Sequence, residues 1–129
     1  MKVHYLNTDL ELESPRDLTP IVEEFGEDVS VLFNGEARGI YIASFEVAGS
    51  FGGPEGIIEF FCMLAETLEG EAKELWDGCY SKKLNIGYEG GVSHQSYEST
   101  ICSGTIERMA KNGASLGITV YPMTNETST

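Results

Sequence analysis

The sequence predicts a single α+β domain built on an antiparallel or mixed sheet, with its helices packed mainly on one face. The chain has 129 residues, of which 41% are hydrophobic. A chain of this size can form one hydrophobic core without the help of disulfide bonds or metal ions. Segments of strand-like alternation outnumber helix-like segments, and some follow one another without a helix between them, which favours hairpins. The predicted order is β-α-β-β-α-β-β-α-β over residues 1–122, followed by a polar tail at 123–129.

The first predicted strand alternates apolar side chains with carboxylates over residues 6–13, the pattern of a strand with one wet face. The next predicted element is a helix that begins at Asp17, because apolar residues recur at i, i+3, i+4 and i+7 as far as Phe25. Pro20 is tolerated in its first turn, and Gly26 is a natural stop.

Two strands are predicted next, at residues 29–33 and 40–47. Between them, Asn34 and Gly35 form a dipeptide that strongly favours a tight hairpin turn. A longer loop that continues to Gly39 is the alternative.

The central core helix is predicted to begin at Pro54, a good first helical residue, and to carry apolar residues at helical spacing as far as Leu68. Gly70 interrupts it. A short second piece over residues 71–77 is expected to bury Leu75 and Trp76.

The last third is predicted to contain strands at residues 82–89 and 97–102, a short helix capped by Ser103, and a closing strand at 114–120. The helical periodicity predicts three inward-facing side chains on that helix: Ile106, Met109 and Ala110.

The net charge is −13, and it is confined to the first three-fifths of the chain. Residues 1–77 contain 17 acidic and 4 basic residues, a difference of −13, whereas residues 78–129 contain 4 of each. Such a surface repels phosphate backbones, so direct binding of nucleic acid is not expected, and it attracts basic proteins. The simpler interpretation is that the acidity serves solubility.

The candidate binding residues fall into two acidic groups, which we expect to form one or two contiguous patches on the surface. The second group, which runs from Glu66 to Asp77, has Lys73 as its only base and is also what a solvated helix face looks like. The candidates are Asp9, Glu11, Glu13, Glu23, Glu24, Glu27 and Asp28 in the first group, and Glu69, Glu71, Glu74 and Asp77 in the second. Aromatic anchors for a partner could come from Tyr5, Tyr41, Trp76, Tyr80 and Tyr88.

One pair of residues is a candidate for nucleophilic catalysis. Cys79 lies in a predicted turn and His94 in a predicted loop, a combination that could supply a nucleophile and its base. Cys62 and Cys102 are interpreted as packing residues. Neither the cysteines nor the two histidines show the spacing of a metal site, so no metal or cofactor is expected. Three cysteines and no apolar leader at the N-terminus favour a cytoplasmic location.

Four segments resemble blocks found in small acidic bacterial immunity proteins, which neutralise the toxin domains of contact-dependent inhibition and Rhs-type systems. They cover about half of the chain and are LELESPRDLTPIVEEFG (10–26), ASFEVAG (43–49), AETLEGEAKELWDGCYSKKLNIGYEGG (65–91) and GASLGITVYP (113–122). The resemblance implies a non-enzymatic inhibitor of a toxin domain, and many toxins of these systems are nucleases, whose clefts are basic. The net charge of −13 predicts that the chain binds such a basic domain as a monomer, in a one-to-one complex. The resemblance carries over no site residues. A small enzyme using Cys79 and His94, and an acidic housekeeping binding module, are the alternatives.

Overall fold

The computed structural model describes residues 3–49, 52–91 and 96–122. In these residues five strands form one mixed sheet, and with four helices they make a small single-domain α+β fold, as predicted. None of the described helices has the length and apolar character needed to cross a membrane. The predicted tail at 123–129 lies outside the described residues. The elements are β1 (His4–Ser14), α1 (Thr19–Phe25), the 3₁₀ turn η1 (Gly26–Asp28), β2 (Val29–Ala37), β3 (Ile40–Val47), α2 (Pro54–Glu66), α3 (Gly70–Asp77), β4 (Ser81–Glu89), α4 (Ser103–Lys111) and β5 (Ser115–Tyr121).

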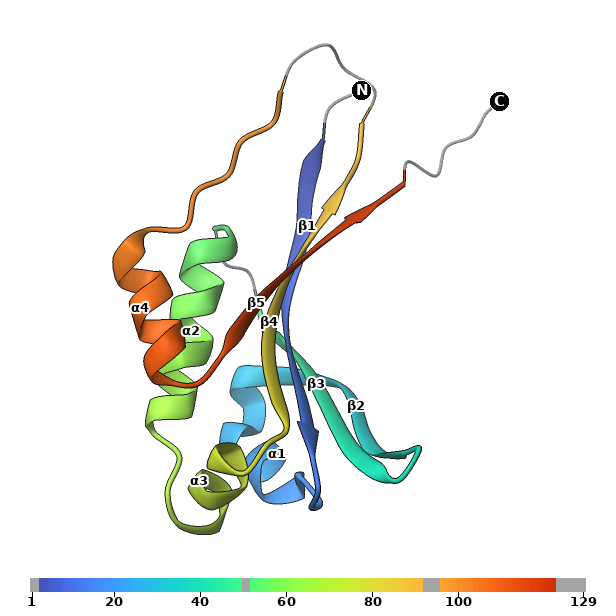
Figure 1. Ribbon diagram of the computed structural model, residues 1–129, viewed down its shortest axis with the longest axis vertical. Coiled ribbons are helices and arrows are strands. Elements are labelled where there is room, and N and C mark those ends of the chain that lie inside the picture. The colour runs from blue at the N-terminus through green and yellow to red at the C-terminus, as the bar shows by residue number, and fades with distance from the viewer. Residues whose placement is uncertain (1–2, 50–51, 92–95, 123–129) are drawn as a thin grey trace.

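The N-terminal strand lies in the middle of the sheet, whose strand order is β2-β3-β1-β4-β5. Leu10 of β1 pairs with Phe45 of β3 on one side and Leu84 of β4 on the other, both antiparallel. Strands β4 and β5 are parallel, which makes the sheet mixed. Figure 1 shows the helices gathered on one side of the sheet, so none of the described helices covers its other face.

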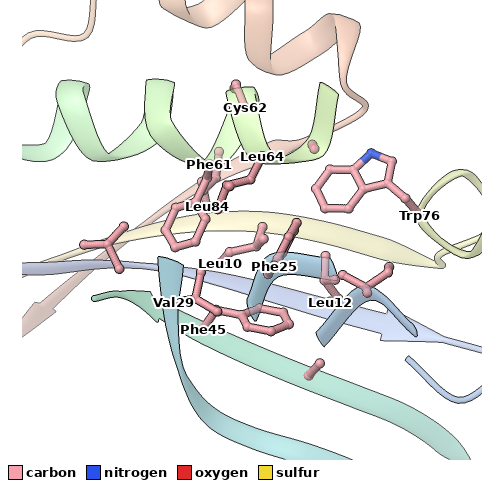
Figure 2. Close-up of a cluster of buried hydrophobic side chains, with 14 of the residues drawn as sticks. Leu10, Leu12, Phe25, Val29, Phe45, Phe61, Cys62, Leu64, Trp76 and Leu84 are labelled. Atoms are coloured by element: carbon pink, nitrogen blue, oxygen red, sulfur yellow. The ribbon is translucent and has the colours of Figure 1, made fainter. Parts of the chain in front are cut away.

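The core fills the space between the sheet and α2 (Figure 2). The alternation predicted for β1 is confirmed from Thr8 onward, because Thr8, Leu10 and Leu12 are buried while Asp9 and Glu11 alternate with them on the other face. Leu6, which was expected on the buried face, is 47% exposed. From α2, Phe61 points toward the sheet (Figure 2), and Cys62 is also a buried member of the cluster. Each large side chain so buried contributes roughly 1.5–3 kcal/mol relative to an exposed position.

Helix α1 begins at Thr19, two residues after the predicted start at Asp17, and it ends at Phe25 as predicted. The carboxylate of Asp17 accepts hydrogen bonds from the Thr19 backbone N–H at 2.9 Å and from its hydroxyl at 2.7 Å, just before the first turn. Gly26 has a φ of +58°, which ends the helix. Phe25 packs edge-to-face on Phe45 with ring centroids 5.2 Å apart, and this contact holds α1 against the sheet.

The predicted hairpin at Asn34 and Gly35 is wrong, because both residues lie inside β2 and pair with β3. The chain turns instead at Arg38 and Gly39, whose φ angles are +56° and +86°. Two consecutive positive φ angles define the two-residue turn whose twist suits a hairpin. A bulge between Val31 and Phe33 shifts the register of β2 before the turn.

The strand predicted at residues 97–102 is also wrong. This segment has no partner in the sheet, and residues 96–100 are exposed. Both edges of β4 are occupied, by β1 and β5. A parallel β4–β5 pair needs a crossover, and residues 97–102 together with α4 run along the helix side of the sheet to provide it (Figure 1).

Helix α4 turns a different side to the core than its apolar pattern predicts. Ile106 and Ala110 are exposed, so their predicted inward placement is wrong, whereas Met109 is buried as expected. Thr105 is also buried, because its hydroxyl donates a hydrogen bond to Glu59 of α2 at 2.9 Å. Polar contacts with α2 thus help set the orientation of α4.

Candidate functional site

The end of the molecule formed by α1, η1 and α3 is strongly acidic. Helices α1 and α3 pack side by side, and the Glu24 carboxylate accepts a hydrogen bond from the Glu69 backbone N–H at 3.3 Å. This packing unites residues from both predicted acidic groups, which are more than 40 residues apart in sequence. We call the set the helix-end surface; its members, all exposed, are Glu23, Glu24, Glu27, Asp28, Glu69, Glu71, Glu74 and Asp77.

Little positive charge offsets the helix-end surface. Lys73 forms an ion pair with Asp77 at 3.2 Å, and both side chains are largely exposed. Glu27 and Asp28 follow the C-terminus of α1, which has no basic residue in its last turn. An acid beside the negative end of a helix dipole costs a few tenths of a kcal/mol. The charge therefore does not stabilise the fold locally.

The remaining predicted acids lie on the open face of the sheet, away from the helices. We define the sheet-face surface as Asp9, Glu11, Glu13 and Glu46. Asp9 of β1 pairs directly with Glu46 of β3. The nearest offsetting groups are Lys83, whose Nζ lies 3.8 Å from Glu11, and Asn7, whose amide donates to Glu46 at 3.4 Å. The first predicted acidic group is thus divided between two faces, because β1 turns its carboxylates away from the helices.

Asp9 has the least favourable electrostatic surroundings of the four carboxylates of the sheet-face surface. Its Oδ1 is buried and has no hydrogen-bond partner among the described residues. Burial, followed by the negative charges of Glu46 and Glu11, raises the pKa of Asp9 to about 6. Sequence patterning missed Glu46, which is opposite Asp9 only through the β1–β3 register.

Replacing Asp9 with asparagine is expected to stabilise the protein by about 1 kcal/mol at pH 7. The pKa is raised from 3.8 to about 6, so stability present in acid is lost as the pH rises through that interval. The full shift corresponds to about 3 kcal/mol, which we reduce because the side chain is only half-buried and is screened by solvent. Urea unfolding at pH 7 should show the gain, and at about pH 4 it should vanish. Glu13→Gln, on the same strand and face, is the control, and an equal Asp9→Asn gain at both pH values would contradict this explanation.

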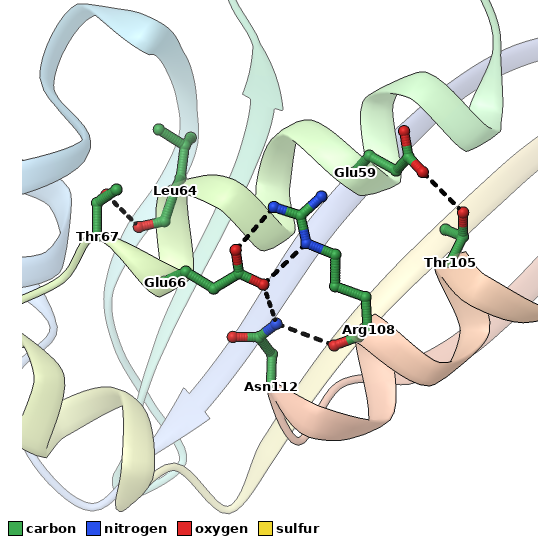
Figure 3. A network of polar contacts seen from close by, with 7 residues as sticks. All are labelled: Glu59, Leu64, Glu66, Thr67, Thr105, Arg108 and Asn112. Carbon is green, nitrogen blue, oxygen red and sulfur yellow. Dashed lines mark hydrogen bonds and ion pairs between the residues drawn. The ribbon is translucent and has the colours of Figure 1, made fainter.

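Three acids of α2 bind α4 or the residue just before it, and two of them, Glu59 and Glu66, are drawn in Figure 3. Glu55 accepts a hydrogen bond from the Cys102 backbone N–H at 2.8 Å, and Glu59 binds the hydroxyl of Thr105. Glu66 accepts two hydrogen bonds from the Arg108 guanidinium, at 2.7 and 2.8 Å, and a third from the Asn112 amide at 3.0 Å.

These contacts change the interpretation of Glu66. Its hydrogen bonds from Arg108 and Asn112 lower the pKa of the carboxyl to about 2. The sequence placed Glu66 with the second acidic group on a solvated helix face, and the residue is exposed, but its carboxylate is paired with Arg108 of α4. A bidentate arginine pair between two helices is instead a structural contact.

The candidate nucleophile Cys79 lies in a half-buried position, where its thiol donates to the Leu75 carbonyl at 3.3 Å. Burial raises the pKa of Cys79 to about 11 in spite of the nearby Lys82, so the thiol is protonated at neutral pH. Its proposed partner His94 lies outside the described residues. The described residues contain no cluster of three or more side chains suited to a metal ion.

The other two cysteines differ from each other. Cys62 is buried in the core, as predicted. Cys102 is exposed, so its interpretation as a packing residue is wrong, and the neighbouring Glu55 carboxylate raises the pKa of its thiol. The chain reaches Cys102 along the surface crossover rather than in a strand.

An apolar groove that the sequence did not predict lies beside β5. It has a volume of about 550 Å³ and is bounded by β4, β5, the crossover segment and α4. The closing strand forms as predicted, and three of its alternating apolar side chains, Leu116, Ile118 and Val120, are 39%, 61% and 61% exposed. We call this feature the β5 groove.

Comparison with known proteins finds no family model, no curated protein and no solved structure that matches this chain.

Proposed function

We propose that this protein binds a basic protein through its helix-end surface and acts as a toxin-neutralising immunity protein of the kind its sequence resembles. The observation that carries the proposal is that the packing of α1 against α3 gathers eight exposed carboxylates, from α1, η1, α3 and the preceding Glu69, with Lys73 as the base among them. The partner is a basic, nuclease-type toxin domain, and the encounter takes place in the cytoplasm.

Electrostatics supports this pairing of surfaces. A nuclease binds phosphates, so its cleft is basic, and carboxylates can occupy positions that phosphates would otherwise take. Electrostatic potentials of opposite sign on the two proteins raise the association rate constant well above about 10⁵–10⁶ M⁻¹s⁻¹, the value for partners without such attraction. Fast capture suits an inhibitor that must reach an enzyme before the enzyme reaches its substrate.

Tyr80 supplies an apolar anchor at the same end of the molecule. It follows α3 closely and is 67% exposed, while its backbone N–H is fixed by a 2.7 Å hydrogen bond to the Glu13 carbonyl. Trp76 and Tyr88, two other predicted anchors, are buried in the core. An exposed tyrosine on a fixed backbone offers contact area with little loss of entropy on binding.

The direct test is to co-express the chain with the product of the gene immediately upstream, since an immunity gene directly follows its toxin gene. A complex with one partner per chain is expected. Its association rate should fall at least tenfold between about 0.1 and 1 M salt, because the Debye length shortens from about 10 to about 3 Å, while the dissociation rate changes less. An association rate that is indifferent to salt would contradict the proposal.

A further inference from the structure

We propose that two copies of this protein pair through the outer edges of β5 in antiparallel orientation, joining two five-stranded sheets into one continuous sheet across a two-fold axis. The interface would close the β5 groove of each copy against the other copy.

The outer edge of β5 is suited to pairing with another strand. Within the part of the chain that the structure describes, no strand lies beyond β5, so alternate backbone N–H and C=O groups point outward without a ladder partner. The ladder with β4 runs from Ser115 to Tyr121 without a register shift. Natural edge strands are commonly protected by charged residues, proline or bulges, and β5 has none of these within its bounds.

The side chains of β5 are self-complementary in such a pair. If Ile118 lies on the two-fold axis, it meets Ile118 of the other copy, and Leu116 faces Val120 of the other copy. These side chains belong to the helix-facing side of the sheet, as their β4 partners Leu84 and Tyr88 do. On the opposite face of the sheet, Gly117 of one copy faces Thr119 of the other copy. Both residues are small, so the two backbones can approach without a clash.

The area is sufficient for a specific but modest interface. Six apolar side chains that border the edge or the groove are between 39% and 61% exposed: Tyr97, Ile106, Leu116, Ile118, Val120 and Tyr121. Together they expose roughly 600 Å² per copy, so a dimer buries about 1,200 Å², the lower limit for stable interfaces.

The distribution of charge favours a second copy at this edge over a charged partner. Residues 78–129 contain four acidic and four basic residues, whereas the helix-end surface contains eight carboxylates. Copies repel one another through their acidic surfaces and meet least repulsion here. A basic protein finds no counter-charge on β5 itself.

The opposite edge of the sheet is less suited to pairing, although Val31, Leu32 and Phe33 of β2 are exposed there. A bulge interrupts β2 at these residues, and the acidic turn η1 precedes them directly. Both features disfavour an edge-to-edge contact.

This dimer differs from the monomer expected from the net charge. Each copy keeps its own helix-end surface, on elements that are not part of the β5 edge, so one partner per chain is still accommodated. The proposal concerns the chain alone and does not depend on the proposed function.

The test is the molar mass of the purified chain by sedimentation and light scattering, from about 1 to about 100 μM, the range in which a modest interface forms. The mass should rise from 14.1 kDa toward twice that value. Ile118→Glu and Ile118→Lys should each stay monomeric, because like charges meet on the axis. An equimolar mixture of the two should form a heterodimer, which only self-contact of position 118 explains.

Leu32→Glu is the matched control, since it places the same charge on an exposed apolar residue of the other edge. It should leave dimer formation unchanged, and circular dichroism should show native folding for every variant. A wild-type mass of 14.1 kDa at the highest concentration would overturn the proposal. So would a mixture that stays monomeric, or a dimer abolished by Leu32→Glu. If the wild type is a monomer and Ile118→Glu abolishes binding of the upstream gene product, the groove belongs to that partner instead.

Discussion

Replacing Trp76 with alanine is expected to lower the free energy of unfolding by about 4 kcal/mol. The indole is 2% exposed, and its Nε1 donates a hydrogen bond to the Asn112 carbonyl at 3.0 Å. Lys82 places its Nζ 5.9 Å from the ring centroid and donates to the Trp76 carbonyl at 3.2 Å. One side chain therefore joins α3, the start of β4 and the turn that follows α4.

The loss has two physical sources. The truncation leaves a cavity that the surrounding helices and sheet can only partly fill, and it removes the donor that satisfies the Asn112 carbonyl. Urea unfolding measures the change. Tyr80→Ala is the control, because that aromatic is 67% exposed and its truncation should change stability by less than about 0.5 kcal/mol. A Trp76→Ala protein within about 1 kcal/mol of the wild type would show that the indole is not a core element.

Reversing the charge of Glu23 and Glu27 together, to lysine, is expected to slow association with the basic partner by about 10- to 100-fold. Both side chains are exposed on the helix-end surface. Glu24 is left unchanged, because its carboxylate receives the Glu69 N–H and its loss would disturb α3. Dissociation should change much less, since steering acts on the encounter. Stopped-flow mixing or surface plasmon resonance gives both rates.

The control is Glu98→Lys with Glu107→Lys, which changes the net charge by the same amount in the neutral last third of the chain. Both residues are exposed. If this variant slows association equally, overall charge and not the helix-end surface directs the encounter. A third variant, Glu11→Lys with Glu13→Lys, tests the sheet-face surface. Its effect should be smaller, because Lys83 already lies 3.8 Å from Glu11.

Local periodicity was a sound guide wherever an element buries one face. The alternation of β1, the helical spacing of α2 and the separate short helix with Leu75 and Trp76 each place the right side chains in the core. The helix break itself comes earlier than predicted, because α2 ends at Glu66 and Gly70 begins α3. These elements bury apolar surface on one side only, so the sequence pattern and the packing carry the same information.

The predictions from sequence fail where contacts between residues distant in the sequence determine the local structure. Asn34 and Gly35 favour a turn locally, but continued pairing with β3 as far as Ala37 outweighs that preference. Residues 97–102 have strand-like composition, yet β4 has no free edge to offer them. Strand-like character predicts a strand only when a neighbour is available.

The acidic surfaces illustrate the same limit. The sequence identified their carboxylates, but only the packing of α1 on α3 brings Glu24 beside Glu69. Likewise, the sequence alone does not distinguish Glu66 from the neighbouring acids. Only the structure shows its hydrogen bonds with Arg108, which lies 42 residues later. Which acids are free for a partner and which stabilise the fold is a property of the tertiary structure.

The central position of β1 has a consequence for how the chain folds during synthesis. Leu10 leaves the ribosome 74 residues before Leu84, its partner in β4. At about 5–20 residues per second, β1 waits roughly 4–15 s for one of its two neighbours. Until then one edge of a strand with a strongly apolar face is open to other nascent chains. The row of Asp9, Glu11 and Glu13 on its other face keeps that waiting strand charged, and charged strands resist aggregation.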